Sequence, residues 1–80
     1  MSAADLVVGV DVGSQGTCAQ AIDAEGVLAT TTYVPHRLSY PHPGWADQDP
    51  SEWLGAVAEA LAEVRRNVGD RPLRAISFGS

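Results

Sequence analysis

The segment from Leu6 to Thr17 constrains the fold more than any other, because it joins an apolar run to a tight glycine-containing turn. Five apolar or small residues lead to Asp11, and a Gly-Ser-Gln-Gly turn at residues 13–16 precedes a second β-prone run. A near-continuous apolar run predicts a strand that is buried on both faces. The glycines at 13 and 16 let the backbone take positive φ and approach a ligand closely, because they have no Cβ atom.

The turn and the neighbouring carboxylate together suit phosphate with magnesium. Successive amides in such a turn form an anion-binding concavity, and Asp11 can hold a hydrated divalent cation beside it. The alternative is an ordinary β-hairpin, because Gly, Ser and Asp are favoured turn residues in any protein. The segment lacks the Lys of the Walker pattern, and it continues as a strand where the dinucleotide fingerprint opens a helix.

Composition narrows the class of partner. The chain has 80 residues, is 45% hydrophobic and carries a formal net charge of −5, which indicates one globular domain at most and argues against nucleic acid or an anionic membrane as partner. We find no apolar run of membrane-spanning length and no signal-peptide pattern. The single Cys18 cannot form an internal disulfide and favours a reducing compartment. The expected location is the cytoplasm.

Hydrophobic patterning predicts an α/β fold in which a three-stranded antiparallel meander is followed by a helix and a further strand. Gly26 is expected to close the second hairpin in the left-handed region. A frayed lead-in is expected at residues 1–5, and the strand at 73–78 is expected to be buried. The other predicted segments are strands at 6–12, 17–23 and 27–34, a loop at 35–49 and a helix at 50–68.

The predicted helix has clear boundaries. Asp49 suits the N-cap, Pro50 the first helical position and Glu52 the third position of a capping box, while Gly69 is a typical C-terminal stop. The apolar face is expected to contain Trp53, Leu54, Val57, Ala58, Ala60, Leu61, Val64 and Val68. The solvated face is expected to contain Glu59, Glu63, Arg65 and Arg66.

The loop at 35–49 contains two histidines and a tryptophan. His36 and His42 have no metal-site spacing and no cysteine nearby, so we interpret them as solvated loop residues. Trp45 is expected to anchor the loop on the domain, with stacking on a ligand as the alternative.

The order of these elements around the Asp-x-Gly-Ser turn resembles the opening of the sugar kinase and actin superfamily, whose ATPase domains have a ribonuclease H-like fold. The segment from Pro43 to Trp53 reads Pro-Gly-Trp-Ala-Asp-Gln-Asp-Pro-Ser-Glu-Trp and resembles a segment of the FGGY carbohydrate kinases. The resemblance extends from Leu6 to Phe78. Within the family, the segment Asp-Gln-Asp-Pro-x-x-Trp resembles the pentulose and gluconate kinases more than the glycerol kinases. Xylulose is therefore the first candidate sugar.

The resemblance implies ATP and Mg²⁺ as cofactors, and a sugar or polyol as substrate. Asp11 would organise magnesium, mainly through water, and the hydroxyls of Ser14 and Thr17 would donate to phosphoryl oxygens. The residues that the resemblance places along the phosphate-binding turn are Gly13, Ser14, Gln15, Gly16 and Thr17.

The chain also departs from the family pattern. Members usually carry Lys or Arg where this chain has Cys18, and the resemblance places the catalytic base further along a longer chain, so no catalytic residue is expected here. We therefore expect an N-terminal piece of a kinase that is inactive alone and needs the remainder of the kinase chain, with a homo-oligomer as a further option. The alternative is a non-catalytic actin-like domain that binds nucleotide or a partner protein. One sheet face is expected to lie uncovered.

Overall fold

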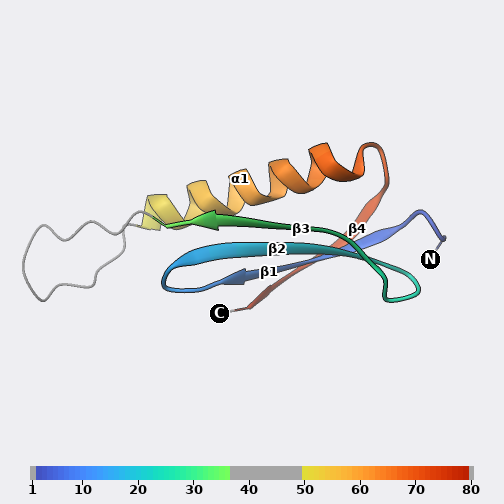
Figure 1. Ribbon diagram of the computed structural model, residues 1–80, viewed down its shortest axis with the longest axis horizontal. Helices are drawn as coiled ribbons and strands as arrows, with labels where there is room; N and C mark the ends of the chain where they lie inside the picture. Colours follow the sequence, from blue (N-terminus) through green and yellow to red (C-terminus); the bar gives the residue numbers. More distant parts are fainter. Residues whose placement is uncertain (1, 37–49, 80) are drawn as a thin grey trace, which may run out of the picture.

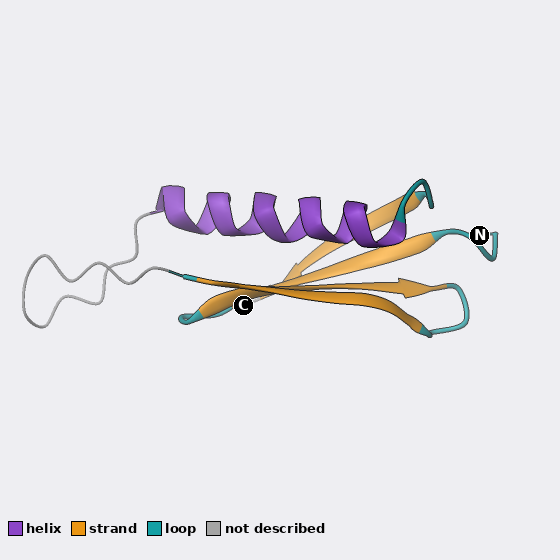
Figure 2. Ribbon diagram, turned by 45° about the horizontal axis from the view of Figure 1, so that its top comes forward, coloured by secondary structure: helices purple, strands orange, loops and turns teal. Residues whose placement is uncertain are grey.

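The computed structural model describes residues 2–36 and 50–79 of the protein. A sheet of four strands is covered on one face by helix α1 (Figures 1 and 2). The elements in chain order are β1 Leu6–Val12, β2 Gly16–Asp23, β3 Leu28–Pro35, α1 Pro50–Val68 and β4 Leu73–Gly79. The predicted order of strands and helix is confirmed. Within the part of the chain described, no helix is long and apolar enough to cross a membrane.

The sheet has the order β3-β2-β1-β4, in which β1–β2 and β2–β3 pair antiparallel and β1–β4 pair parallel. The three-stranded meander is therefore confirmed. At the β2–β3 turn, the Asp23 carboxylate accepts hydrogen bonds from the amides of Glu25 and Val27, both at 2.9 Å. Gly26 has a φ of 84°, so the expected left-handed closure of this turn is also confirmed.

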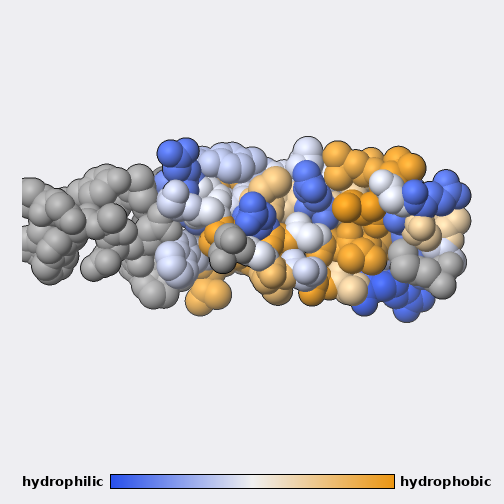
Figure 3. Space-filling model, turned by 90° about the horizontal axis from the view of Figure 1, so that it is seen from below, coloured by the Kyte–Doolittle hydropathy of each residue, from blue (hydrophilic) through white to orange (hydrophobic). Residues whose placement is uncertain are grey.

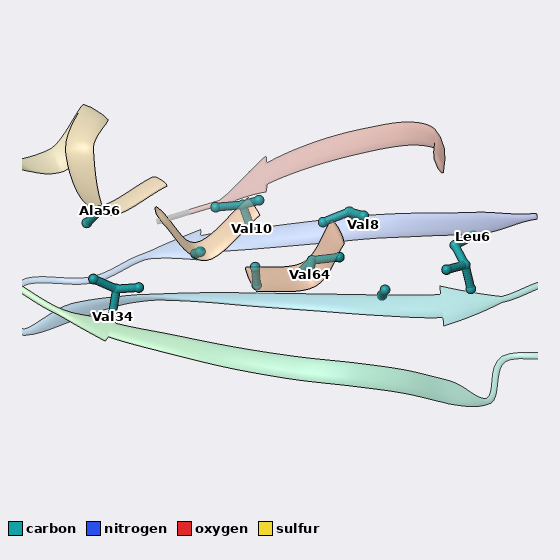
Figure 4. Close-up of a cluster of buried hydrophobic side chains, with 9 residues drawn as sticks. Leu6, Val8, Val10, Val34, Ala56 and Val64 are labelled. Atoms are coloured by element: carbon teal, nitrogen blue, oxygen red, sulfur yellow. The ribbon is translucent and has the colours of Figure 1, made fainter. Parts of the chain in front are cut away.

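The core lies between α1 and one face of the sheet (Figure 4). Helix α1 lies mainly over β2 and β3 and makes fewer contacts with β1. The Thr32 hydroxyl links β3 to the helix by donating to the Ala60 carbonyl oxygen at 3.2 Å. Alanines on the helix and on β2 let the two layers approach closely. The buried hydrophobic side chains are Leu6, Val8, Val10, Ala19, Ala21, Val34, Ala56, Ala60 and Val64.

The sequence predicted where helix α1 begins and where it ends. The helix begins at Pro50 as expected, whereas Asp49 lies outside the described residues and so does the side chain of Glu52. At the other end, Gly69 has a φ of 65° and its amide donates to the Arg65 carbonyl oxygen at 3.0 Å. The predicted glycine stop is confirmed.

The apolar face of α1 was only partly predicted. Leu54 is 72% exposed and Trp53 is 42% exposed, and Ala58 is also exposed. The assignment of these three residues to the packed face is therefore wrong. Ala56, which the pattern did not select, is buried in line with Ala60 and Val64, each about one helical turn from the next. Short alanine side chains occupy the closest approach to the sheet, and the larger Leu54 projects away from it.

Two strands are less buried than predicted. On β1, Val7 and Gly9 are only half-buried and Asp11 is exposed, because no described segment packs on the face away from α1. Strand β4 is almost entirely exposed. Its Ile76 and Phe78 pair with Val8 and Val10, but α1 does not extend over them, and they remain 46% and 63% exposed.

The lead-in is held in place, so the prediction that it is frayed is wrong for residues 2–5. The Asp5 side chain is buried, accepts from the Ser2 amide at 2.9 Å and lies 3.2 Å from the Arg74 guanidinium. Arg71 also donates to the Ala4 carbonyl oxygen at 3.1 Å. Basic residues that follow α1 in the sequence thus fix the start of the chain.

Candidate functional site: the β1–β2 turn and the adjoining sheet face

The turn between β1 and β2 is closed by its own backbone. The Gly13 amide donates to the Gly16 carbonyl oxygen at 2.9 Å, and the last ladder pair joins Val12 to Thr17. Among the described residues, positive φ occurs only at Gly26 and Gly69, so Gly13 and Gly16 do not use the conformational freedom that glycine allows. The turn forms without left-handed residues.

Gly16 instead lies in close contact with an aromatic neighbour. A Cβ atom at this position would lie 2.3 Å from both Cζ and Oη of Tyr33, and 2.7 Å from its Cε1. The Tyr33 ring from β3 therefore rests directly against the turn. At Gly13 the nearest atom to such a Cβ is the Gly16 carbonyl oxygen at 3.5 Å, an ordinary contact.

His36 follows β3 directly and is buried, so its interpretation as a solvated loop residue is wrong. Its Nε2 lies 2.7 Å from the Thr17 hydroxyl oxygen, and its backbone amide donates to the Gln15 carbonyl oxygen at 2.8 Å. The other loop residues that the sequence singled out, His42 and Trp45, lie outside the described residues.

The predicted site residues divide between two faces of the sheet. Asp11 is exposed at the end of β1, on the face away from α1, and Ser14 and Gln15 are exposed in the turn. Thr17 is fully buried, and its hydroxyl faces His36 on the helix side. The turn and the carboxylate thus adjoin each other, whereas the Thr17 hydroxyl does not reach the exposed surface of the turn.

A shallow hollow of about 350 Å³ extends from Asp11 along the face away from α1. Asp11 pairs across the ladder with Cys18, and Gly9 with Gln20. The residues that line the hollow are Gly9, Val10, Asp11, Cys18, Gln20, Ser77, Phe78 and Gly79. Figure 3 views the molecule from the side away from α1, and hydrophobic side chains gather there over the half nearer the β2–β3 turn. The hollow lies over the other half, next to the candidate site.

The donor set suits a hydrated cation better than a directly caged one. No group of three or more His, Cys, Asp or Glu side chains with metal-binding geometry occurs among residues 2–36 and 50–79. Magnesium commonly keeps several waters and uses one or two carboxylates plus substrate phosphates. An exposed Asp11 beside a turn of backbone amides fits that pattern.

Comparison with known proteins identifies the family. The profile of the FGGY family of carbohydrate kinases, N-terminal domain, matches residues 6–80. The chain belongs to this family. FGGY relatives include the xylulose kinase of Staphylococcus epidermidis, 29% identical over 76 residues, and the glycerol kinase of Aquifex aeolicus, 32% identical over 73 residues. The matches cover 92% and 91% of this chain but 15% of each relative.

Solved FGGY structures confirm the fold. The crystal structure of xylulose kinase from Rhodospirillum rubrum superimposes with a TM-score of 0.80 at 32% identity, covering 91% of this chain and 15% of that one. The actin-like, ribonuclease H-like α/β fold predicted from the sequence is thereby confirmed. The chain spans about 15% of the length of the kinases that it matches, so it corresponds to a fragment of such an enzyme.

Sequence reasoning missed the two side chains that support the turn, Tyr33 and His36. One signal for His36 was present. In β3, Thr32 and Val34 are buried, and His36 occupies the next alternate position on the same face. Extending the period-two pattern by one residue past Pro35 would have placed the imidazole inside.

Proposed function

We propose that the full-length protein containing this chain is an ATP-dependent carbohydrate kinase, which transfers the γ-phosphoryl group to a sugar hydroxyl. The observation that carries the proposal is the exposed Asp11 carboxylate beside the β1–β2 turn, within a chain whose family consists of carbohydrate kinases. By itself the chain is expected to be inactive, because the family resemblance places the catalytic base further along a longer chain.

The described residues support binding and orientation. Backbone amides of residues 14–16 and the Ser14 side chain would contact phosphoryl oxygens, and Asp11 would hold Mg²⁺ through water. The amide of Gly13 instead closes the turn by donating to the Gly16 carbonyl oxygen. Bound Mg²⁺ would supply neutralisation of charge on the transferring phosphoryl group. Thr17 would contribute through its backbone, since its hydroxyl is buried against His36.

Xylulose is the first candidate substrate, from the Asp-Gln-Asp-Pro-x-x-Trp segment. The relatives reported above bear the names of both xylulose and glycerol kinases, so a screen should compare these two substrates with gluconate. The remaining parts of the proposal are a cytoplasmic location, the rest of the kinase chain as an intramolecular partner, and a homo-oligomer.

The test is Asp11→Asn in the full-length protein, assayed by sugar-dependent ADP release. We expect turnover to fall at least about 100-fold, because a charge that organises the phosphoryl-transfer site is lost. Asp70→Asn is the matched control, since Asp70 is exposed in the turn after α1, and it should retain normal turnover. Near-normal turnover of Asp11→Asn with unchanged magnesium dependence would defeat the assignment.

A second candidate function is nucleotide binding without transfer, in an actin-like domain. It is favoured by Cys18, which lines the hollow directly opposite Asp11, where FGGY kinases usually carry a cation. ATP binding without ADP release in the presence of xylulose, glycerol or gluconate would support this candidate. If the kinase proposal holds, Cys18→Arg should tighten ATP binding, because a guanidinium there would offset phosphate charge.

A further inference from the structure

His36 makes hydrogen bonds to both neighbours of Gly16. Its backbone amide donates to the Gln15 carbonyl oxygen at 2.8 Å, and its Nε2 lies 2.7 Å from Oγ1 of Thr17. One residue at the end of β3 therefore contacts the turn at two points, through the main chain before Gly16 and through the side chain after it. A purely apolar residue at this position could make only the first of these contacts.

Burial makes the second contact energetically significant. The His36 side chain is 9% exposed and Thr17 is 0% exposed, so neither polar group can replace its partner with bulk water. Breaking such a bond leaves a buried polar atom without a partner, which destabilises the opened state. The Thr17–His36 bond therefore resists displacement of the turn relative to β3.

The surroundings of the ring indicate which nitrogen carries the proton. Nδ1 of His36 is buried without a hydrogen-bond partner in the described structure. Orphaned buried N–H groups are rarer in proteins than unpaired acceptors, so the favoured neutral tautomer has the proton on Nε2. In that tautomer Nε2 donates to the Thr17 hydroxyl oxygen, and Nδ1 is left as an unpaired acceptor.

Tyr33 adds a third contact from the same strand end. Its ring lies against Gly16 so closely that a Cβ there would overlap it. Tyr33 contacts the turn from the exposed face, whereas His36 contacts it from the helix side. Between them, the last residues of β3 limit movement of the turn in both directions.

We propose that His36 is a positioning residue, which holds the β1–β2 turn in its phosphate-binding arrangement through Thr17 and Gln15. The inference rests on the proposed kinase function, because it assigns a catalytic purpose to the order of the turn. His36 itself faces the helix side, so it acts on the reaction through the turn amides. Loss of its ring contact should loosen the turn and misalign these amides with the phosphate.

The experiment uses four test variants and one control variant of the full-length protein. His36→Leu removes the ring contact, Thr17→Val removes its partner with little change of shape, and the third variant combines both changes. His36→Gln keeps a side-chain N–H donor at a similar reach and serves as the conservative rescue. Arg66→Gln, an exposed change on α1, is the control for handling and stability.

Two readouts separate a positioning role from simple packing. Hydrogen exchange of the amides at residues 13–17 should accelerate about tenfold in His36→Leu and in Thr17→Val, since local opening becomes easier. The value of kcat/KM for ATP should fall about 10- to 100-fold, because a displacement of about 1 Å can cost that much, while KM for the sugar stays unchanged. His36→Gln should recover most of both losses, and the double variant should be no worse than the single ones.

The outcomes are distinct. Unchanged exchange in His36→Leu overturns the proposal whatever the kinetics show. Faster exchange with wild-type kcat/KM for ATP, or an equal loss in His36→Gln and His36→Leu, also overturns it, because His36 would then only fill space. Failure of the kinase function appears elsewhere, as wild-type protein that releases no ADP with any sugar. In that case, the exchange contrast between Leu and Gln still decides whether the ring contact orders the turn.

Discussion

Replacing Gly16 with alanine tests whether contact with the Tyr33 ring fixes the position of the β1–β2 turn. The added Cβ would lie 2.3 Å from Cζ and Oη of Tyr33, whereas carbon atoms in ordinary contact are about 3.5–4.0 Å apart. Either the ring or the turn must therefore move by more than about 1 Å. Because Gly16 does not adopt positive φ, this overlap, and not backbone strain, is the expected cost of the substitution.

The exposure of Tyr33 determines how much of the overlap is relieved by movement of the ring and how much by movement of the turn. The side chain is 57% exposed, so part of the strain can be relieved by rotation of the ring into solvent. The remainder displaces the turn, and we expect kcat/KM for ATP to fall about tenfold, equivalent to about 1.4 kcal/mol of transition-state stabilisation. The assay is steady-state ADP release by the full-length protein at saturating sugar.

The decisive comparison is with Gly16→Ala combined with Tyr33→Ala. If the ring is the cause, the double variant should lie within about threefold of Tyr33→Ala alone, because the two substitutions are strongly coupled. A double variant that loses the full product of both effects would refute the reasoning. Gly55→Ala is the control, because a Cβ at this exposed helical position meets no atom within 4 Å and should stabilise α1 by up to about 1 kcal/mol.

Three further predictions concern the scaffold. Leu6→Ala, at a fully buried position, should lower the free energy of unfolding by about 2–5 kcal/mol. Leu54→Ala, at a position 72% exposed, should change it by less than about 0.5 kcal/mol. Chemical denaturation measures both values, and equal losses would contradict the packing described. The Ser2 amide, with a further contribution from Arg74 and against the opposing effect of burial, lowers the pKa of Asp5 below 3.8. Its stabilisation should be fully present above pH 3.8 and be lost as the pH falls through the lower folded-state pKa, so Asp5→Asn should flatten the acid limb of a stability–pH profile. The 80-residue chain alone should self-associate through its uncovered apolar surface, and a monomer by light scattering would contradict this.

The fold was predictable where local chemistry decides it. Alternation, turn glycines and the Pro50 and Gly69 boundaries predicted the order and extent of the elements to within about two residues, as is usual for such boundaries. The packed face of α1 was harder to predict, because this helix carries apolar residues on several sides. Ala56 contributes little hydrophobicity to a sequence pattern, yet its small size is what suits the closest contact with the sheet.

The candidate site likewise combines residues that a local sequence pattern reveals with residues that only tertiary packing brings in. Asp11 and the 13–16 turn are contiguous in sequence, and their pattern was recognised there. Tyr33 and His36 lie about 20 residues away from the turn and reach it only through the β2–β3 register, which pairs Gly16 with Pro35. Register depends on tertiary packing and on the bulge between Ala21 and Ile22, neither of which a local pattern specifies. The fixed position of residues 2–5 was not predicted for the same reason, because it depends on contacts with Arg71 and Arg74, which are distant in the sequence.

The position of β1 has a consequence for the order of folding. Its partner β2 follows after a turn of three residues, whereas its other partner β4 begins only after β3 and α1 have passed. Closing the longer loop costs more chain entropy, and strand pairings distant in sequence form slowly. We therefore expect the meander with α1 to collapse first, with Leu73 and its neighbours docking last. During synthesis, the β1–β2 turn would acquire its shape, and its support from β3, well before β4 leaves the ribosome.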